Sequence, residues 1–379
     1  MARVEIKPEL IQWARERAGL AFDALVTHFP KLQAWETGQT KPTLKQLEKY
    51  AKATMAPLGY FFLPVPPDEP LPLPDFRTPR NASARSHPSP NLLDTVYAMQ
   101  RRQAWLRDDR IDHGIEPVPF VGSTTVEAAP QTVAAAMRVA LGVGTAWAAE
   151  HRTWTEALHA LRSSIEMAGI MVVANGVVGN NTHRKLDPGE FRGFVLADRY
   201  APLIFINGAD GKAAQMFTLA HELAHLWVGQ DAVFNLAYLE PAEALVERFC
   251  NRVAAEFLIP EQEMRAAWAE DGDSPDPYDA IARRFKVSGL VAARRALDLG
   301  LISRDAFALF YEGYLEAQRR AATDVGGGGD FYSNQGVRVG RVFAAAVHRA
   351  VLEGRLPYRE AFELTGLHGA TFDKYMRKA

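Results

Sequence analysis

Two histidines four residues apart give the clearest chemical signal in the sequence. His221 and His225 flank Glu222 in the segment His221-Glu222-Leu223-Ala224-His225. Positions i and i+4 of a helix lie on one face, so both imidazoles can reach one cation. Neutral imidazole nitrogens suit Zn²⁺, and the intervening glutamate stays off the metal, where it can accept a proton from water. The segment predicts a hydrolytic zinc site, although so short a motif also arises by chance.

A catalytic zinc site needs a third protein ligand and an open position. Glu243, Glu247 and Glu256 compete for this role in the next helical stretch. We favour Glu247, because Asn251 follows one turn later, where its amide oxygen could accept a hydrogen bond from a ligand histidine. Glu243 is the second choice as ligand. A solvated helix face is the other interpretation of Glu247 and Asn251.

Peptide hydrolysis also needs a hydrogen-bond donor for the developing oxyanion. The candidates are His183, Arg192, Tyr238 and Tyr332. We choose Tyr332, because it follows a run of glycines from 326 to 329 that could bring it toward the cleft. Cys250 points away from the face of Glu247, which favours packing over metal binding.

Length and composition bound the protein class. The chain has 379 residues, of which 48% are hydrophobic and 23% charged, as expected for two or three globular units. A net charge of -2 excludes a chain-wide basic field for nucleic acid. The single cysteine excludes an intramolecular disulfide and a cysteine-based zinc cluster. The sequence has no run of about 18 apolar residues, which a membrane span would need. We therefore expect a cytoplasmic protein without membrane partners.

Hydrophobic spacing predicts an α+β fold dominated by helices. Nine prolines between residues 64 and 90 separate an N-terminal group of short helices from the rest. A helix from 154 to 167 precedes three β-rich runs bounded by Gly, Asp and Pro, at 170–174, 193–196 and 203–206. The later helical patterns cover residues 211–230, 241–258, 276–298, 303–322, 337–353 and 357–377.

Two spaced motifs resemble the ImmA/IrrE family of zinc metallopeptidases. They are Phe-Thr-Leu-Ala-His-Glu-Leu-Ala-His-Leu at 217–226 and Glu-Arg-Phe-Cys-Asn-Arg-Val-Ala-Ala-Glu-Phe-Leu-Ile-Pro at 247–260. In that family the two motif histidines and a glutamate of the following helix bind zinc. The resemblance therefore implies Zn²⁺ bound by His221, His225 and Glu247, with Glu222 as general base, in a zincin-like peptidase domain.

Residues 8–53 resemble a helix-turn-helix domain of the XRE type. The matching segments are Leu10–Leu20, Trp35–Gly38 and Pro42–Ala51, and Arg15 and Glu36 are placed to form an ion pair. Only 16 residues separate Gly19 from Glu36, which shortens the turn and the start of the recognition helix. The first 50 residues hold eight basic and six acidic side chains, which is a small excess of positive charge for contacts with DNA phosphates. We therefore favour protein docking or a structural role over DNA binding for this part.

These inferences divide the chain into four segments with one leading function. The segments are an XRE-like domain at 1–75, a Pro-rich linker and helical connector at 76–150, a zincin-like metallopeptidase domain at 151–300 and a C-terminal helical region at 301–379. The resemblance implies a zinc endopeptidase that hydrolyses a regulatory protein such as an XRE-type repressor or antitoxin. The alternative is a DNA-binding regulator or toxin–antitoxin component whose metal site is structural or sensory.

Overall fold

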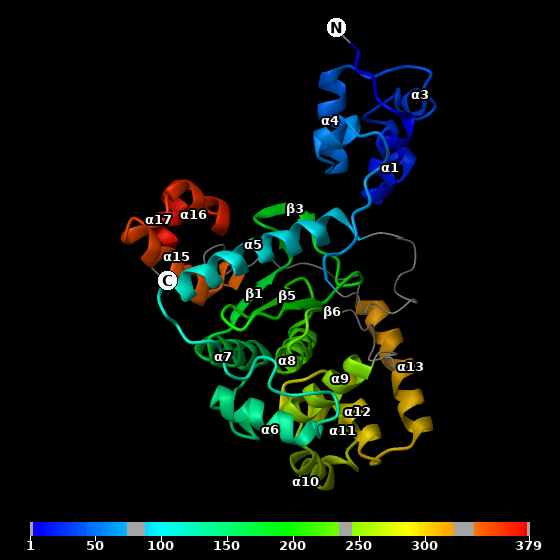
Figure 1. The fold of residues 1–379 in the computed structure, drawn as a ribbon. Coiled ribbons are helices and arrows are strands. Elements are labelled where there is room, and N and C mark those ends of the chain that lie inside the picture. Colours follow the sequence, from blue (N-terminus) through cyan, green and yellow to red (C-terminus); the bar gives the residue numbers. More distant parts are fainter. Residues whose placement is uncertain (1–2, 74–87, 235–244, 322–336, 377–379) are drawn as a thin grey trace. The chain divides into compact units, whose positions relative to one another are not determined.

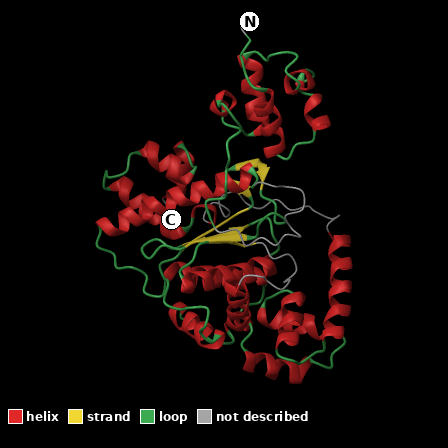
Figure 2. Ribbon diagram, turned by 45° about the vertical axis from the view of Figure 1, so that its right-hand side comes forward, coloured by secondary structure: helices red, strands yellow, loops and turns green. Residues whose placement is uncertain are grey.

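The computed structural model describes residues 3–73, 88–234, 245–321 and 337–376 (Figure 1). They form two compact units, one drawn from Met1–Pro72 and Ala82–Tyr97 and the other from Leu73–Asn81 and Ala98–Ala379. Helices dominate, and the strands form a small sheet (Figure 2). The α+β class predicted from the sequence is confirmed. In the described part of the chain, no helix combines the length and apolar character that a membrane span requires.

The first unit is a group of short helices around an aromatic core. Its elements are α1 (Pro8–Arg17), α2 (Phe22–Val26), α3 (Leu32–Glu36), α4 (Leu44–Thr54) and the 3₁₀ turn η1 (Leu58–Phe62). Thr43 and Gln46 cap α4 reciprocally, because each side chain accepts a hydrogen bond from the backbone N–H of the other. Arg15 Nε donates to Glu36 Oε1 at 2.8 Å, which ties α1 to α3. Tyr50 is fully buried at the centre, and its hydroxyl donates to Ile11 O.

The second unit is built on a four-stranded sheet of order β1-β5-β4-β6. The strands are β1 (Met171–Asn175), β4 (Gly193–Leu196), β5 (Leu203–Asn207) and β6 (Ala232–Phe234). β1 and β5 run parallel, whereas β4 is antiparallel to both of its neighbours. All side chains of β1, β4 and β5 are buried, so helices must cover both faces of the sheet.

Helices from distant parts of the chain cover those two faces. α7 (Trp154–Met167) and α8 (Lys212–Val228) pack on one face. The part of α5 (Pro90–Asp112) in the second unit lies across the other face with α15 (Arg341–Leu352), as Figures 1 and 2 show. Gln103 Nε2 on α5 donates to the carbonyls of Leu196 and Ala201, at 2.8 and 3.0 Å. The sheet is therefore a buried central layer.

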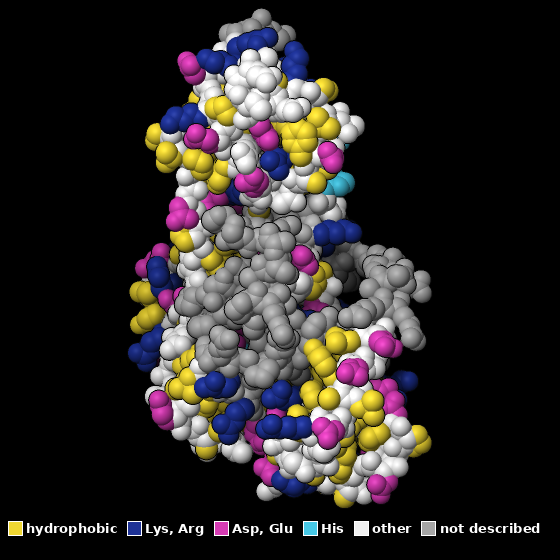
Figure 3. All heavy atoms as spheres, turned by 90° about the vertical axis from the view of Figure 1, so that its right-hand side faces the viewer, with side chains coloured by type: hydrophobic (Ala, Val, Ile, Leu, Met, Phe, Trp, Pro, Cys, Tyr) yellow, Lys and Arg dark blue, Asp and Glu magenta, His cyan; other side chains and the backbone are white. Residues whose placement is uncertain are grey.

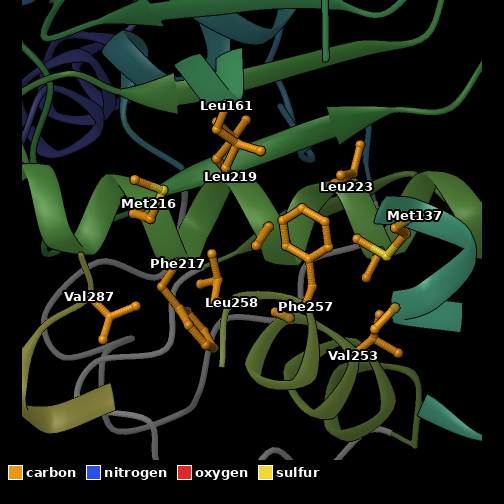
Figure 4. Close-up of a cluster of buried hydrophobic side chains, with 14 of the residues drawn as sticks. Met137, Leu161, Met216, Phe217, Leu219, Leu223, Val253, Phe257, Leu258 and Val287 are labelled. Atoms are coloured by element: carbon orange, nitrogen blue, oxygen red, sulfur yellow. The ribbon is translucent and has the colours of Figure 1, made fainter. Parts of the chain in front are cut away.

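A large hydrophobic core lies beyond α8. It is built by α6 (Pro130–Leu141), α9 (Leu245–Leu258), α10 (Glu261–Asp271), α11 (Pro277–Phe285) and α12 (Gly289–Asp298), with α13 (Arg304–Ala321) following. Figure 4 shows side chains of these helices meeting those of α7 and α8, among them Met137, Leu161, Leu219, Leu223, Val253 and Phe257. α6 shares this core although it precedes residue 151, where the sequence places the start of the peptidase segment. The four-segment division itself stays a prediction.

The structure divides one stretch that the sequence predicts as a continuous helix. The 276–298 stretch breaks at Lys286, whose φ of 55° ends α11 in the left-handed region. In the 357–377 stretch the sequence predicts two helices around Gly366, and the structure confirms them as α16 (Tyr358–Thr365) and α17 (Gly369–Met376), with a φ of 70° at Gly366. The sequence also misses β6 and the hairpin of β2 (Val177–Val178) and β3 (Asn181–Lys185). β3 is a mostly exposed polar run without the alternation that marks a half-buried strand.

A preceding loop fixes the C-terminal end of α8. Gly229 ends the helix with φ 77°, and a Cβ there would lie 2.8 Å from Gly122 Cα. Gly122 N donates to Leu226 O at 3.0 Å. The rings of Phe120 and Trp227 stack with centroids 4.2 Å apart. The close backbone approach therefore requires glycine at position 229.

Replacing Gly229 by alanine should lower the free energy of unfolding by about 2–4 kcal/mol. The left-handed backbone costs about 1 kcal/mol, and the clash with Gly122 adds roughly 1–3 kcal/mol. Gly142 is the matched control, because it ends α6 with φ 65° and a Cβ there would meet nothing within 4 Å. Urea denaturation should therefore show a smaller loss for Gly142→Ala. Equal losses would mean that the Gly122 contact is unimportant.

Candidate metal centre

α8 places both motif histidines and the glutamate between them inside the protein. The helix starts after Gly211 and ends at Gly229, so His221, Glu222 and His225 all lie in its second half. All three side chains are fully buried. The Nε2 atoms of His221 and His225 lie 3.0 Å apart, on the same face of the helix.

α9 brings a carboxylate to the two histidines. Glu247 Oε2 lies 3.2 Å from His221 Nε2, and Glu247 Oε1 lies 3.0 Å from His225 Nε2. One donor atom from each of the three residues falls within 4.8 Å of the others. Three converging donors, two imidazoles and a carboxylate, are the protein ligands of a catalytic zinc site with an open position. The donor set therefore fits a divalent metal ion.

The pKa shifts of His221 and Glu247 also fit a metal ligand set. Burial lowers the pKa of His221 and favours the neutral ring. Burial raises the pKa of Glu247, but the charges and hydrogen bonds of the two histidines outweigh this effect and lower it to about 2. Neutral imidazole and ionised carboxylate are the forms that bind metals.

Glu222 is a buried carboxyl group beside this cluster. Neither of its oxygens has a hydrogen-bond partner among the described residues. Burial and the negative charge of Glu247 raise its pKa well above the usual value. An isolated carboxyl group in the core is costly, and such groups concentrate at functional sites. Glu222 thus stands next to three potential metal ligands without a hydrogen-bond partner among the described residues.

Gly193 makes room for Glu222. The sequence patterns did not predict this role of Gly193. A Cβ at this position of β4 would lie 3.1 Å from Glu222 Oε1 and 2.7 Å from the Thr218 side chain. It would also lie 2.9 Å from the carbonyl oxygen of Phe205. A glycine inside a buried strand is a signal of such close approach, so the sequence held this clue.

Asn251 lies near the cluster, one turn after Glu247. Its Oδ1 makes no regular hydrogen bond with a described residue. The amide still lies close enough to His221 to raise the pKa of that ring slightly, against the larger effect of burial. This position fits the role that the sequence suggests, a contact that orients a histidine from outside the ligand set.

None of the other described candidates belongs to the cluster of donors, and the remaining ones lie outside the described residues. Arg192 pairs with Asp210 at 3.0 Å, and His183 lies on the exposed strand β3. Glu256, once a possible ligand, forms a buried ion pair with Arg295. Tyr332, Tyr238 and Glu243 lie outside the described residues. Cys250 is fully buried in the core, where burial raises its thiol pKa, as expected for packing.

Comparison with known families places the cluster in a peptidase domain. Residues 165–297 match the IrrE N-terminal-like domain, peptidase family M78. This segment contains α8, α9 and the whole His221–Glu247 cluster. Residues 339–378 match a domain family of unknown function, DUF8813. No curated protein matches the chain. The match supports the predicted ImmA/IrrE relationship and a metallopeptidase, while the XRE-like domain stays a prediction.

The purified protein should hold about one divalent metal ion per chain. Glu247→Ala should lose most of it, because two histidines alone leave the site without its third ligand. Glu222→Gln should keep the metal, since this side chain stands beside the ligand set. Elemental mass spectrometry of protein prepared without a chelator or a histidine tag would measure the content.

Glu243→Ala is the control for that experiment, because Glu243 is the second choice as ligand. It should retain the metal. Metal lost from Glu243→Ala and kept by Glu247→Ala would contradict the geometry of the cluster.

Proposed function

We propose that the chain is a zinc-dependent endopeptidase of the ImmA/IrrE type. The observation that carries the proposal is Glu222, a buried carboxyl group without a hydrogen-bond partner among the described residues. It stands beside the three converging donors of His221, His225 and Glu247. The match of the surrounding segment to a peptidase family supports the same reaction.

Each residue then has one role in peptide hydrolysis. His221, His225 and Glu247 would hold the metal ion. A bound Zn²⁺ would polarise the scissile carbonyl and make water a stronger acid. Glu222 would take a proton from the attacking water and later deliver it to the leaving amine. Burial raises its pKa, which makes its carboxylate a stronger base for this task.

Burial of the cluster serves this chemistry in two ways. With both histidines fully buried, solvent does not screen the charges around the reacting atoms. The orientations of the side chains are set by α8 and α9, which pack extensively against each other.

We further propose that Tyr332 supplies the oxyanion donor, a role tested by a loss of turnover in Tyr332→Phe with the metal retained.

For the substrate, we propose a regulatory protein such as an XRE-type repressor or antitoxin. The N-terminal unit supports this choice, since the Arg15–Glu36 ion pair expected of an XRE-like fold is formed. α3 has only five residues, and Lys31 is the one Lys or Arg between Phe22 and Glu36. With so little positive charge, this unit is better suited to docking a protein than to binding DNA.

Glu222→Gln should keep its metal and lose proteolysis by about 10²–10⁴-fold, the usual contribution of a general base. The assay is cleavage of candidate repressors and of a mixed peptide library, with the fragments identified by mass spectrometry. Glu363→Gln, an exposed change on α16, should cleave like the wild type.

Full proteolysis by Glu222→Gln would refute the assigned role of this residue. Wild-type protein that holds zinc, cuts nothing and binds DNA in a salt-dependent way would favour the alternative, a DNA-binding regulator with a structural or sensory metal site.

A further inference from the structure

Beside the metal centre, the second unit has a pocket of about 570 Å³ with many arginines. It lies among α9, α10 and α12 and the start of α6. Its charged lining is Arg248, Arg252, Arg265, Arg294, Arg295, Glu256, Glu261 and Asp298. Figure 3 shows Lys and Arg side chains gathered in the lower half of one face of the molecule. The pocket is thus rich in positive charge although the whole chain is slightly negative.

The pocket shares a wall with the metal centre. Phe217 lines it, and the centroid of this ring lies 6.4 Å from that of His221. Asn251 also lines it and lies one turn after Glu247 on α9. A chain bound with its scissile bond at the metal therefore has this pocket as an immediate neighbour.

Some of the lining charge is neutralised within the protein. The carboxylate of Glu256 binds Arg295 in a buried pair, while Arg265 pairs with Glu261 at 2.8 Å and Arg294 with Asp298 at 3.0 Å. Arg252 is exposed and forms no ion pair with a described residue. Among the described residues that line the pocket, arginines outnumber acids by five to three, a formal charge of +2.

The floor of the pocket is apolar. Phe217, Ala255 and Val291 are buried side chains that line it beneath the arginines. An apolar floor with a cationic rim suits a peptide segment that combines aliphatic and acidic side chains. A small inorganic anion would leave the floor uncovered.

We propose that this pocket is a recognition site for an acidic segment of the protein substrate, next to the bond that is cut. Arg248 and Arg252 would bind carboxylates, and the apolar floor would accept a neighbouring aliphatic side chain. This inference rests on the proposed peptidase function, because it assigns the pocket to the same substrate.

The test measures binding apart from cleavage. Full-length Glu222→Gln protein loaded with zinc is titrated with fluorescent peptide pools of equal length, each with adjacent Glu, Lys or Gln residues at its centre. The Glu pool should bind roughly tenfold more tightly than the Lys pool, with the Gln pool between them. Arg248→Glu combined with Arg252→Glu should remove or reverse this order.

Two control variants test whether the change in affinity is specific to the charge of the pocket. Arg359→Glu reverses a highly exposed charge on α16 outside the pocket and should leave the order unchanged. Arg252→Gln is the milder variant, and it should weaken the preference without reversing it. Unchanged metal content and circular dichroism would show that each variant is folded.

The outcomes separate this inference from the proposed function. Equal affinity for the Glu and Lys pools overturns the acidic-segment site. So does an Arg359→Glu variant that changes the order of affinities as much as the double variant of Arg248 and Arg252. Wild-type protein that cuts the Glu and Lys pools at equal rates also overturns it while the peptidase stands. An arginine-dependent preference for the Glu pool without cleavage of any pool supports the site and counts against the peptidase.

Discussion

The contact of Glu247 with both His221 and His225 is the constraint on which the second unit depends. It places a carboxylate and two imidazoles inside the hydrophobic core, with the carboxyl group of Glu222 beside them. Burying such groups costs several kcal/mol unless a partner compensates each charge. The histidines compensate Glu247, but Glu222 lacks a hydrogen-bond partner among the described residues. As part of the core alone, this arrangement would only cost stability. A preorganised reaction site explains why such groups are buried together.

The surrounding structure holds this cluster in place. α8 lies against the buried sheet and is fixed at its C-terminal end by the loop that contains Gly122. α9 packs between α8 and α6, and Arg138 on α6 donates to the carbonyl of Glu256 near the end of α9. Both helices that carry the donors are therefore anchored at points away from the donors. Such support is what keeps a site within the narrow range of geometry that catalysis needs.

The sequence predicts the features that arise within one element. The i, i+4 spacing of His221 and His225 and the helical pattern around Glu247 suffice to propose the cluster, and the structure brings these three side chains together. Features that arise between elements were missed. Gly193 approaches Glu222 only because β4 lies under α8, and Gly122 meets Gly229 across more than a hundred residues of chain. β6 is three residues long and gives no periodic signal. Packing of this kind depends on the whole fold, which local patterns do not encode.

α9 carries a metal-cluster residue and two of the pocket arginines, Arg248 and Arg252, on one rigid body. Glu247 and Arg252 are five residues apart on this helix, a rise of about 7.5 Å at 1.5 Å per residue and a rotation of about 140° at 3.6 residues per turn. Because the two side chains point to different faces of the helix, an extended peptide needs more than the roughly two residues that would cover this rise. A substrate held at both places would therefore be cut at a nearly constant distance from its acidic residue. Changes of pocket side chains could alter which residue is recognised, whereas the distance to the cut bond would stay set by the helix.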